Sequence, residues 1–444
     1  MPCPFSSKST DVARYFRRDL IKNALAVGGV AALAACLEED GTPDIPLGIA
    51  DTDDVPERQY AWNEYLSRDP HGNTIFPYHQ LILFLNYVGD SPPSAADRET
   101  VEDAFATLDR AFQRGNGGVD PYQPDGSNTP GVLYTMGYSR NYFELYDESL
   151  PSTAAFLSPE SVLEEVDDDP SKADSYDAAL LLTSDYAQVL LSTELALFGK
   201  LDTLNGIDVE GTLDGAFEIA DRRTGFIGPG VPRRELERDD IPSRSPLAMG
   251  FISGFADNQA SEDAVTIESG PFAGGTTQQI SKLRLDLDGW YDLGHDERIH
   301  LMFSPEHTEE DVGEVGEFLA SDSGLTREMD ELMHEHAETE GIVGHTQKLA
   351  ASRNDEFEPL VLRRSEAVST DEPDPGFNFT SLQRELEAFV DVRKAMNGDH
   401  LEADVEKEHN GILDYISVEA RGTYLIPPRS LIALPPARPE TSFE

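Results

Sequence analysis

The sequence predicts an α+β protein built from two ferredoxin-like halves of the dimeric α/β-barrel type, whose antiparallel sheets pack together. Two observations predict this fold. Apolar runs of strand length alternate with segments of helical spacing, and the ferredoxin-like order of strand, helix, strand, strand, helix, strand occurs twice along the chain. The chain has 444 residues, of which 39% are hydrophobic. This is enough apolar material for one large domain or two modest ones.

The first half is predicted over residues 57–225. Apolar runs indicate strands at residues 79–88, 131–138 and 178–183, with a further short strand near 216–220. Apolar residues at helical spacing indicate a helix over 101–112. A second helix is expected over 185–200, with Asp185 as its cap.

The second half is predicted over residues 226–444. Its strands are expected at residues 283–287, 359–364, 376–380 and 422–426. Its helices are expected over 309–338 and 382–396. A stretch rich in Gly, Pro and Arg, residues 221–244, is interpreted as the connection between the halves.

The chain is strongly acidic, with 84 Asp and Glu residues against 34 Lys and Arg residues and a formal net charge of -50. This charge excludes a nucleic-acid binder that works through a basic face, because phosphate contacts need clustered cations. At near-molar salt the Debye length falls to about 3 Å, so the repulsion between these acids is screened. We interpret the acidity as adaptation to a very salty milieu, with an acid-rich binding surface as the alternative.

Residues 1–36 predict an export signal. The pair Arg17 and Arg18 precedes an apolar stretch that is too short and too rich in Ala and Gly to span a bilayer permanently. This arrangement resembles a twin-arginine signal. Residues 33–36 (LAAC) resemble a lipoprotein cleavage box, which implies a lipid anchor at Cys36 on the outer face of the cell membrane. The alternative is an ordinary Cys in a discarded peptide. Residues 37–56 are interpreted as a tether.

Cys3 and Cys36 are the only two cysteines, so cysteine nucleophiles and thiolate metal sites are excluded from the mature domain. The sequence also lacks a phosphate-binding GxxxxGK[ST] loop and a G-x-S-x-G nucleophile elbow. His334 and His336 lie two residues apart in an expected helix and point to different faces, unlike a zinc-protease pair. Because the twin-arginine route moves folded proteins, often with a cofactor inserted, the signal favours a cofactor protein.

A set of motifs in the second half resembles the dye-decolourising peroxidase family. The motifs, in order, are 254–260 (GFADNQA), 282–290 (KLRLDLDGW), 344–346 (GHT), 362–365 (LRRS), 376–384 (GFNFTSLQR) and 413–428 (LDYISVEARGTYLIPP). Residues 134–143 (YTMGYSRNYF) resemble a strand end of the family's first half. The resemblance spans roughly residues 75–430 and implies two ferredoxin-like halves with a b-type haem in the second.

The family's G-x-x-D-G signature has two possible frames in this chain. In the favoured frame Asp257 takes the acidic position, and Asn258 replaces the second Gly. Asn tolerates the left-handed backbone region, so this change is mild. The resemblance then implies that Asp257 lies on the distal side of the haem and moves a proton between the oxygens of hydrogen peroxide. The other frame, residues 250–254, keeps both glycines but puts Ser253 in place of the acid, which would leave peroxidase activity in doubt.

The resemblance implies that His345 is the proximal iron ligand, since neutral imidazole is a strong axial donor for haem iron. A lone His in apolar surroundings is otherwise more often a packed side chain. A carboxylate normally accepts the other ring N–H of such a ligand, and Asp414 matches this position in the family pattern.

Arg363 is the expected distal cation, because a guanidinium stabilises negative charge on peroxide and can also meet a haem propionate. Arg364 competes for the role, since neighbouring residues of a strand face opposite ways. Ser365 and Phe379 are expected to line the distal pocket.

The resulting hypothesis is an exported, lipid-anchored haem peroxidase that reduces hydrogen peroxide and oxidises a bulky organic reductant. Two alternatives remain open. One is a haem-binding or haem-handling lipoprotein without turnover, and the other is a surface lipoprotein with no cofactor.

Overall fold

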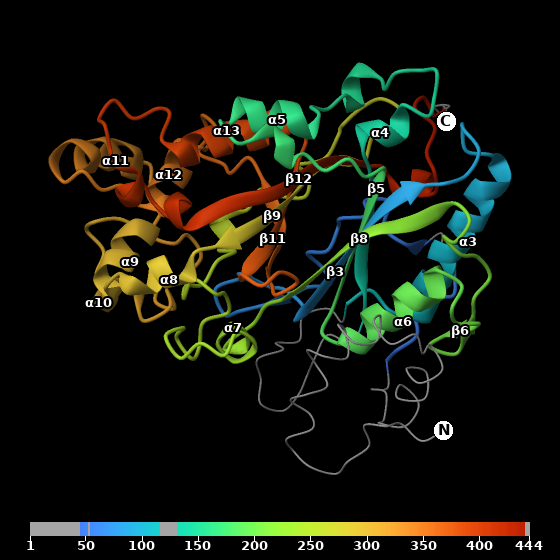
Figure 1. Cartoon of the computed structure of the whole chain (residues 1–444), viewed down its shortest axis with the longest axis horizontal. Coiled ribbons are helices and arrows are strands. Elements are labelled where there is room, and N and C mark those ends of the chain that lie inside the picture. The colour runs from blue at the N-terminus through green and yellow to red at the C-terminus, as the bar shows by residue number, and fades with distance from the viewer. Residues whose placement is uncertain (1–44, 52–53, 116–130, 440–444) are drawn as a thin grey trace, which may run out of the picture.

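Eight strands close into an antiparallel barrel in the computed structural model, which describes residues 45–51, 54–115 and 131–439 (Figure 1). Their order around the barrel is β10-β11-β9-β12-β4-β5-β3-β8. The first half supplies β3 (His79–Tyr87), β4 (Leu133–Tyr138), β5 (Ala178–Ser184) and β8 (Phe217–Phe226). The second half supplies β9 (Thr276–Leu285), β10 (Leu362–Ser369), β11 (Gly376–Gln383) and β12 (Ile416–Ile426).

Each half is a ferredoxin-like sheet, so the predicted fold class is confirmed. In both halves the second strand pairs with the third, the third with the first, and the first with the fourth. The two sheets also meet at both edges, where Leu425 of β12 pairs with Tyr138 of β4 and Val368 of β10 pairs with Phe226 of β8. The contact between the halves is therefore a continuous ladder as well as shared packing.

The core has an inner and an outer part because strand residues alternate between faces. On β3, Ile82 and Phe84 belong to a buried cluster that includes Ile280 and Tyr424 of the second half. The alternate residues Leu81, Leu83 and Leu85 point to the outer face of the sheet, where they belong to the same buried cluster as the apolar residues of the helix that follows β3. One strand thus contributes to both layers, which explains why the predicted run over 79–88 is apolar at nearly every position.

The helices of the first half largely follow the prediction. They are α3 (Ala95–Ala111), α4 (Arg140–Phe143), α5 (Pro159–Glu165) and α6 (Ala187–Leu197). A capping box between Ser94 and Asp97 starts α3 before the first apolar residue of its stripe. The prediction that Asp185 caps the next helix is wrong, since Asp185 Oδ1 accepts a hydrogen bond from the backbone N–H of Tyr78 and the N-cap of α6 is Tyr186.

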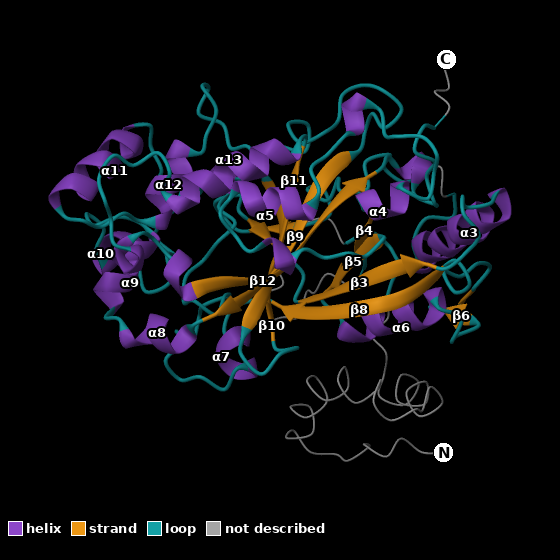
Figure 2. Ribbon diagram, turned by 45° about the horizontal axis from the view of Figure 1, so that its top comes forward, coloured by secondary structure: helices purple, strands orange, loops and turns teal. Residues whose placement is uncertain are grey.

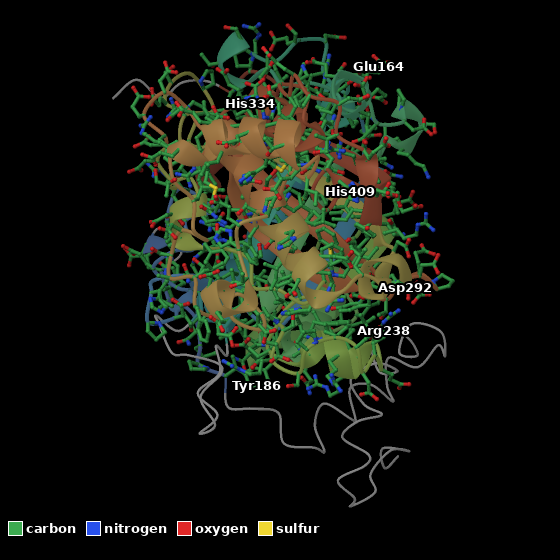
Figure 3. All side chains as sticks on the ribbon, turned by 90° about the vertical axis from the view of Figure 1, so that its left-hand side faces the viewer. Glu164, Tyr186, Arg238, Asp292, His334 and His409 are labelled. Atoms are coloured by element: carbon green, nitrogen blue, oxygen red, sulfur yellow. The ribbon has the colours of Figure 1, made fainter. Side chains whose placement is uncertain are left out.

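The second half carries more helix. Its helices are α7 (Val231–Glu235), α8 (Leu287–Asp292), α9 (His295–Met302), α10 (Glu309–Val312), α11 (Glu328–Thr339), α12 (His345–Ala351) and α13 (Leu386–Asn397). Helices α8 to α12 gather at the left-hand end in Figure 1, which faces the viewer in Figure 3, where Asp292 marks α8 and His334 marks α11. Helix α13 packs on β9 and β11, and α12 packs on α13. Figure 2 shows α13 and α5 lying across the strands.

Three of the differences between the predicted and the observed elements have a clear cause in the structure. The acidic stretch 309–338, predicted to be mostly helical, contains α10 and α11 with a long non-helical segment between them, in which Gly313, Gly316 and Gly324 adopt positive φ. Residues 221–226 belong to β8 and not to the connection, since they pair with β3. The predicted helix over 382–396 begins only at Leu386, because Leu382 lies in β11.

The remaining elements are short. Two-residue strands form the pairs β1 (Ser67–Arg68) with β2 (Thr74–Ile75) and β6 (Thr203–Leu204) with β7 (Ile207–Asp208). Turns of 3₁₀ helix lie at Ser152–Ala154, Pro170–Lys172, Ala256–Asn258, Lys407–His409, Leu413–Tyr415 and Arg429–Leu431. Across the described ranges, no helix is both long and apolar enough to cross a membrane.

The described chain begins within the predicted tether. Ile45 is buried in the core of the first half, and the backbone N–H of Gly48 donates to the carbonyl oxygen of Arg110 at 2.9 Å. Residues 45–51 of the predicted tether therefore pack on the folded first half. The predicted signal and lipidation site, residues 1–36, lie outside the described residues.

Candidate functional site

A cavity of about 650 Å³ lies between the sheet of the second half and its helical layer. The strands contribute Leu283, Arg363, Phe379 and Arg421 to its lining, and α12 and α13 contribute His345, Phe389 and Arg393. A smaller cavity of about 110 Å³ shares His345, Arg363, Glu366 and Phe377 with the larger one. The larger volume is in the range typical of cavities that bind cofactors and small ligands.

His345 is the first residue of α12, and Gly344 fixes where that helix begins. The backbone N–H of Gly344 donates to Oε1 of Gln347 at 3.0 Å, which caps the helix. A Cβ atom at Gly344 would overlap the backbone carbonyl of Phe303. Glycine is therefore required for close approach, and this contact sets the position from which His345 faces the cavity.

The imidazole of His345 is neutral. Burial, followed by the positive charges of Lys348, Arg363 and Arg393, lowers the pKa of His345 to about 3. Its Nδ1 atom is buried and makes no hydrogen bond to any described residue. A neutral imidazole in a cavity is the form that binds a metal ion.

Lys348 lies one turn after His345 and holds α12 in place. Its buried Nζ donates to the carbonyl oxygens of Met396 and Asn410, both at 2.7 Å, and to Oδ1 of Asn410 at 2.9 Å. Burial, with a smaller effect of Arg393, lowers the pKa of Lys348 to about 7. The three bonds tie α12 to the end of α13 and to the loop before β12.

Arg363, the expected distal cation, lines both cavities. Its Nη1 donates to Oγ of Ser253 at 2.9 Å and to Oε1 of Glu366 at 2.8 Å. Arg364 points away from the cavities and forms a buried ion pair with Glu262 at 2.5 Å. Of the two arginines that the sequence leaves open, the structure brings Arg363 to the cavity.

A β-bulge explains which side chains of β10 face the cavity. Arg363 pairs with Ser381 and Ser365 with Thr380, so Arg364 is the extra residue in the ladder. The bulge shifts the alternation and puts Glu366 on the same face as Arg363. Sequence reasoning missed Glu366, because simple alternation would place Ser365 there.

Of the two residues expected to line the pocket, Ser365 and Phe379, only one lines either of the two cavities. Phe379 lines the larger cavity, as expected. Ser365 lines neither cavity, and its Oγ donates to Oε1 of Gln80 at 2.6 Å and to the carbonyl oxygen of Asn378 at 3.1 Å. Its expected contact with the pocket is corrected to a polar contact between β10 and β3.

Asp257 lies outside both cavities. Its side chain is exposed, and its Oδ2 accepts a hydrogen bond from Oγ of Ser321 at 2.8 Å. The sequence pattern favours the frame through Asp257, but Ser253 of the other frame lines the smaller cavity and contacts Arg363. The loop between residues 250 and 258 therefore presents a hydroxyl to the cavity in place of a carboxylate.

Asp414 also lies away from His345. It is exposed and forms an ion pair with Lys407 at 2.8 Å. No hydrogen bond joins it to the imidazole, whose Nδ1 lacks a partner within the described residues. The expected hydrogen bond between the carboxylate of Asp414 and the imidazole of His345 is therefore absent from the described structure.

At one end of the larger cavity lies a cluster of charged side chains that no local sequence motif predicts. Asp168, from a loop of the first half, accepts from Arg421 at 2.8 Å and from Arg393 at 3.4 Å. Asp168 lies more than two hundred positions before the two arginines in the sequence, so only the folded chain brings it to them. Within the described ranges, no group of three or more His, Cys, Asp and Glu residues is arranged to hold a metal ion by itself.

The side chains that line the larger cavity are chemically suited to hold a haem group. The walls of the larger cavity include the aromatic rings of Phe377, Phe379 and Phe389, which suit a flat macrocycle. Nδ1 of His345 is buried and makes no hydrogen bond within the described residues, so this ring nitrogen has no protein partner there. The guanidinium groups of Arg393 and Arg421 suit carboxylates at the ligand's edge.

The structure thus defines an α+β barrel protein with a cavity between the sheet and the helices of its second half. The chain belongs to the family described as "Family of unknown function (DUF7405)", whose model it matches over residues 77–428. No curated protein matches the chain.

Several solved structures are similar to this chain. The dye-decolorizing protein from V. cholerae is 13% identical, with a TM-score of 0.49, 84% of this chain covered and 98% of that chain. A putative dyp-type peroxidase from Shewanella oneidensis is 15% identical, with a TM-score of 0.48 and coverages of 80% and 94%. A dye-decolorizing peroxidase from Bacteroides thetaiotaomicron is 15% identical, with a TM-score of 0.48 and coverages of 84% and 98%.

Proposed function

We propose that this protein binds haem b through His345 and acts as a peroxidase of the dye-decolourising type. One observation carries the proposal: a buried, neutral imidazole, whose Nδ1 has no hydrogen-bond partner among the described residues, lines a cavity of about 650 Å³ that it shares with Arg363. Bound haem would supply the redox chemistry by which hydrogen peroxide is reduced and a bulky organic reductant is oxidised.

The residues of this chain have distinct roles in the proposal. His345 would bind the iron, and the rings of Phe379 and Phe389 would pack on the macrocycle. Arg393 and Arg421 would bind the propionates, in exchange for part of their pairing with Asp168. Arg363 would stabilise negative charge on a peroxide anion, because a fixed cation in a water-poor cavity interacts strongly with developing charge.

A second candidate is a haem-binding or haem-handling protein without turnover. Two observations favour it: Asp257 lies outside the cavities, and Asp414 is paired with Lys407. In their place, His345 has Lys348, Arg363 and Arg393 as its charged neighbours. A cationic surrounding weakens an imidazole donor, whereas a carboxylate strengthens it.

Hemin titration tests the shared part of both candidates. The purified protein should take up one hemin per chain and develop a Soret band. His345→Ala should weaken hemin binding by at least about 100-fold, because loss of the ligand itself should cost no less than loss of a residue that hydrogen-bonds to a ligand. His409→Ala is the matched control, because this imidazole is 47% exposed. Equal hemin affinity in the wild type and His345→Ala would contradict the proposed ligand.

Peroxide-driven oxidation of an anthraquinone dye separates the candidates. A peroxidase should oxidise the dye, and Arg363→Ala should lower the rate on the order of 100-fold if its charge acts on peroxide. A fully loaded protein that never oxidises the dye would favour the haem-handling candidate.

We also propose that the protein is exported and anchored to the outer face of the cell membrane through Cys36. The support is the sequence pattern at residues 17–18 and 33–36. Cys36→Ser tests the anchor, because it removes the thiol to which a lipid would be attached.

A further inference from the structure

The smaller cavity has the size and lining of a site for a very small molecule. Its volume of about 110 Å³ leaves room for a few molecules of the size of water. Most of its wall is apolar, from residues such as Leu247, Phe251 and Ile412. A bulky organic reductant does not fit there, but hydrogen peroxide does.

Three polar side chains meet in this small cavity. Arg363 lies between Ser253, at 2.9 Å, and Glu366, at 2.8 Å. The side chains of Arg363 and Glu366 are 13% and 12% exposed. Of the described residues that line the small cavity, Glu366 is the one carboxylate. Asp257 and Asp414, the carboxylates suggested by the sequence, lie outside it.

Arg363 and Glu366 lie in the sheet, on β10, whereas His345 lies in the helical layer that covers it, on α12. All three side chains line both cavities. If haem were bound by His345, Arg363 and Glu366 would be the charged pair that shares the smaller cavity with that imidazole.

We propose that Glu366 is the proton acceptor for a small weak acid that enters this cavity, and that Arg363 holds the anion that results. The step transfers one proton and no electrons: the carboxylate of Glu366 takes a proton from hydrogen peroxide, giving the carboxylic acid and the hydroperoxide anion. Oγ of Ser253 accepts a second hydrogen bond from the same Nη1 of Arg363 and helps to fix its guanidinium. The inference rests on the proposed function, because the anion is used only if haem is bound at His345.

The bulge at Arg364 is what gives Glu366 this role. In a regular strand, residues 363 and 366 would face opposite ways. The extra residue puts them on one face, so the carboxylate reaches the guanidinium. The carboxylate that this reaction type needs is then supplied from the sheet, because the loop that carries Asp257 contributes no carboxylate to the cavity.

Cyanide is a suitable probe, because hydrogen cyanide is a small weak acid that binds haem iron as its anion and shifts the Soret band. The association rate of cyanide is measured by stopped flow on the hemin-loaded wild type, on Glu366→Gln and on Asp257→Asn. Glu366→Gln should slow association on the order of 100-fold, the lower range for loss of a general base. It should bind hemin as tightly as the wild type. Asp257→Asn is the matched control and should leave the rate unchanged.

A transferred carboxylate gives a second test. Ser253→Asp places an acid beside the same guanidinium, so the double variant Ser253→Asp/Glu366→Gln should recover most of the wild-type rate. A purely structural role of Glu366 predicts no such recovery. If Glu366→Gln alone does not take up hemin, the rate of the double variant decides: recovery supports the proposal, and a slow rate overturns it.

The outcomes separate this inference from the proposed function. A wild type that takes up no hemin overturns both. A loaded wild type with Glu366→Gln at the same cyanide rate overturns the role of Glu366 and leaves haem binding intact. A slow Asp257→Asn beside an unaffected Glu366→Gln also overturns it, and returns the role to Asp257.

Discussion

Lys348 allows the electrostatics around His345 to be tested without any ligand. Its side chain is fully buried, and the three acceptors that its Nζ contacts are neutral oxygens of Met396 and Asn410. The pKa of Lys348 is about 7 in the folded protein and 10.5 as the unperturbed value. The folded state therefore releases a proton that the unfolded chain keeps.

This difference predicts a pH-dependent stability. A folded pKa below the unfolded one means that the unfolded chain binds more protons between pH 7 and 10.5, so the free energy of unfolding rises with pH in this window. The fall from 10.5 to about 7 corresponds to about 5 kcal/mol over the whole window. About 3 kcal/mol of this falls between pH 7 and pH 10.

The assay is urea unfolding, followed by circular dichroism at several pH values between 7 and 10 and at constant salt. The wild type should gain about 3 kcal/mol relative to Lys348→Met across this range. Comparing slopes removes the constant cost of the lost hydrogen bonds. Lys394→Met is the control, because this amine is 39% exposed beside Glu165 and its curve should run parallel to the wild type. A parallel curve for Lys348→Met as well would refute the reasoning.

Two further predictions concern the start of α12 and the N-terminus. Gly344→Ala should displace His345, because the added Cβ overlaps the carbonyl of Phe303. The expected results are a loss of about 1–3 kcal/mol in unfolding free energy and hemin affinity at least about tenfold weaker, and unchanged hemin titration would contradict the close contact. Cys36→Ser should move the protein from the membrane fraction to the soluble exported fraction, because one lipid-bearing residue is removed. Fractionation with immunoblotting checks this, and a variant that stays in the membrane fraction would contradict the anchor.

The fold was predictable because its signals are local. The apolar run over residues 79–88 and the helical stripe from Val101 to Phe112 each indicate their element, and the order of elements limits the topology. The closure of the two sheets into one barrel was harder to predict from the sequence, because it depends on pairing between edge strands, such as that of Leu425 with Tyr138. The start of α6 was predicted wrongly because the expected cap, Asp185, accepts a hydrogen bond from the backbone N–H of Tyr78 instead.

The candidate site was only partly predictable. His345, Arg363 and Phe379 were found and do line one cavity. Asp257 and Asp414 were proposed from motif position, but motif position does not say which way a loop side chain points. The structure leaves both exposed.

By itself, the sequence determined the duplicated strand-and-helix pattern, the acidity of the chain and the identity of the candidate imidazole, because each of these can be seen within a short stretch of residues. Only the tertiary structure decided which carboxylate stands beside Arg363. That choice depends on one extra residue in β10, which shifts the alternation between Arg363 and Glu366. A bulge arises from the pairing of β10 with β11, and such pairing between strands is not a property of either segment alone.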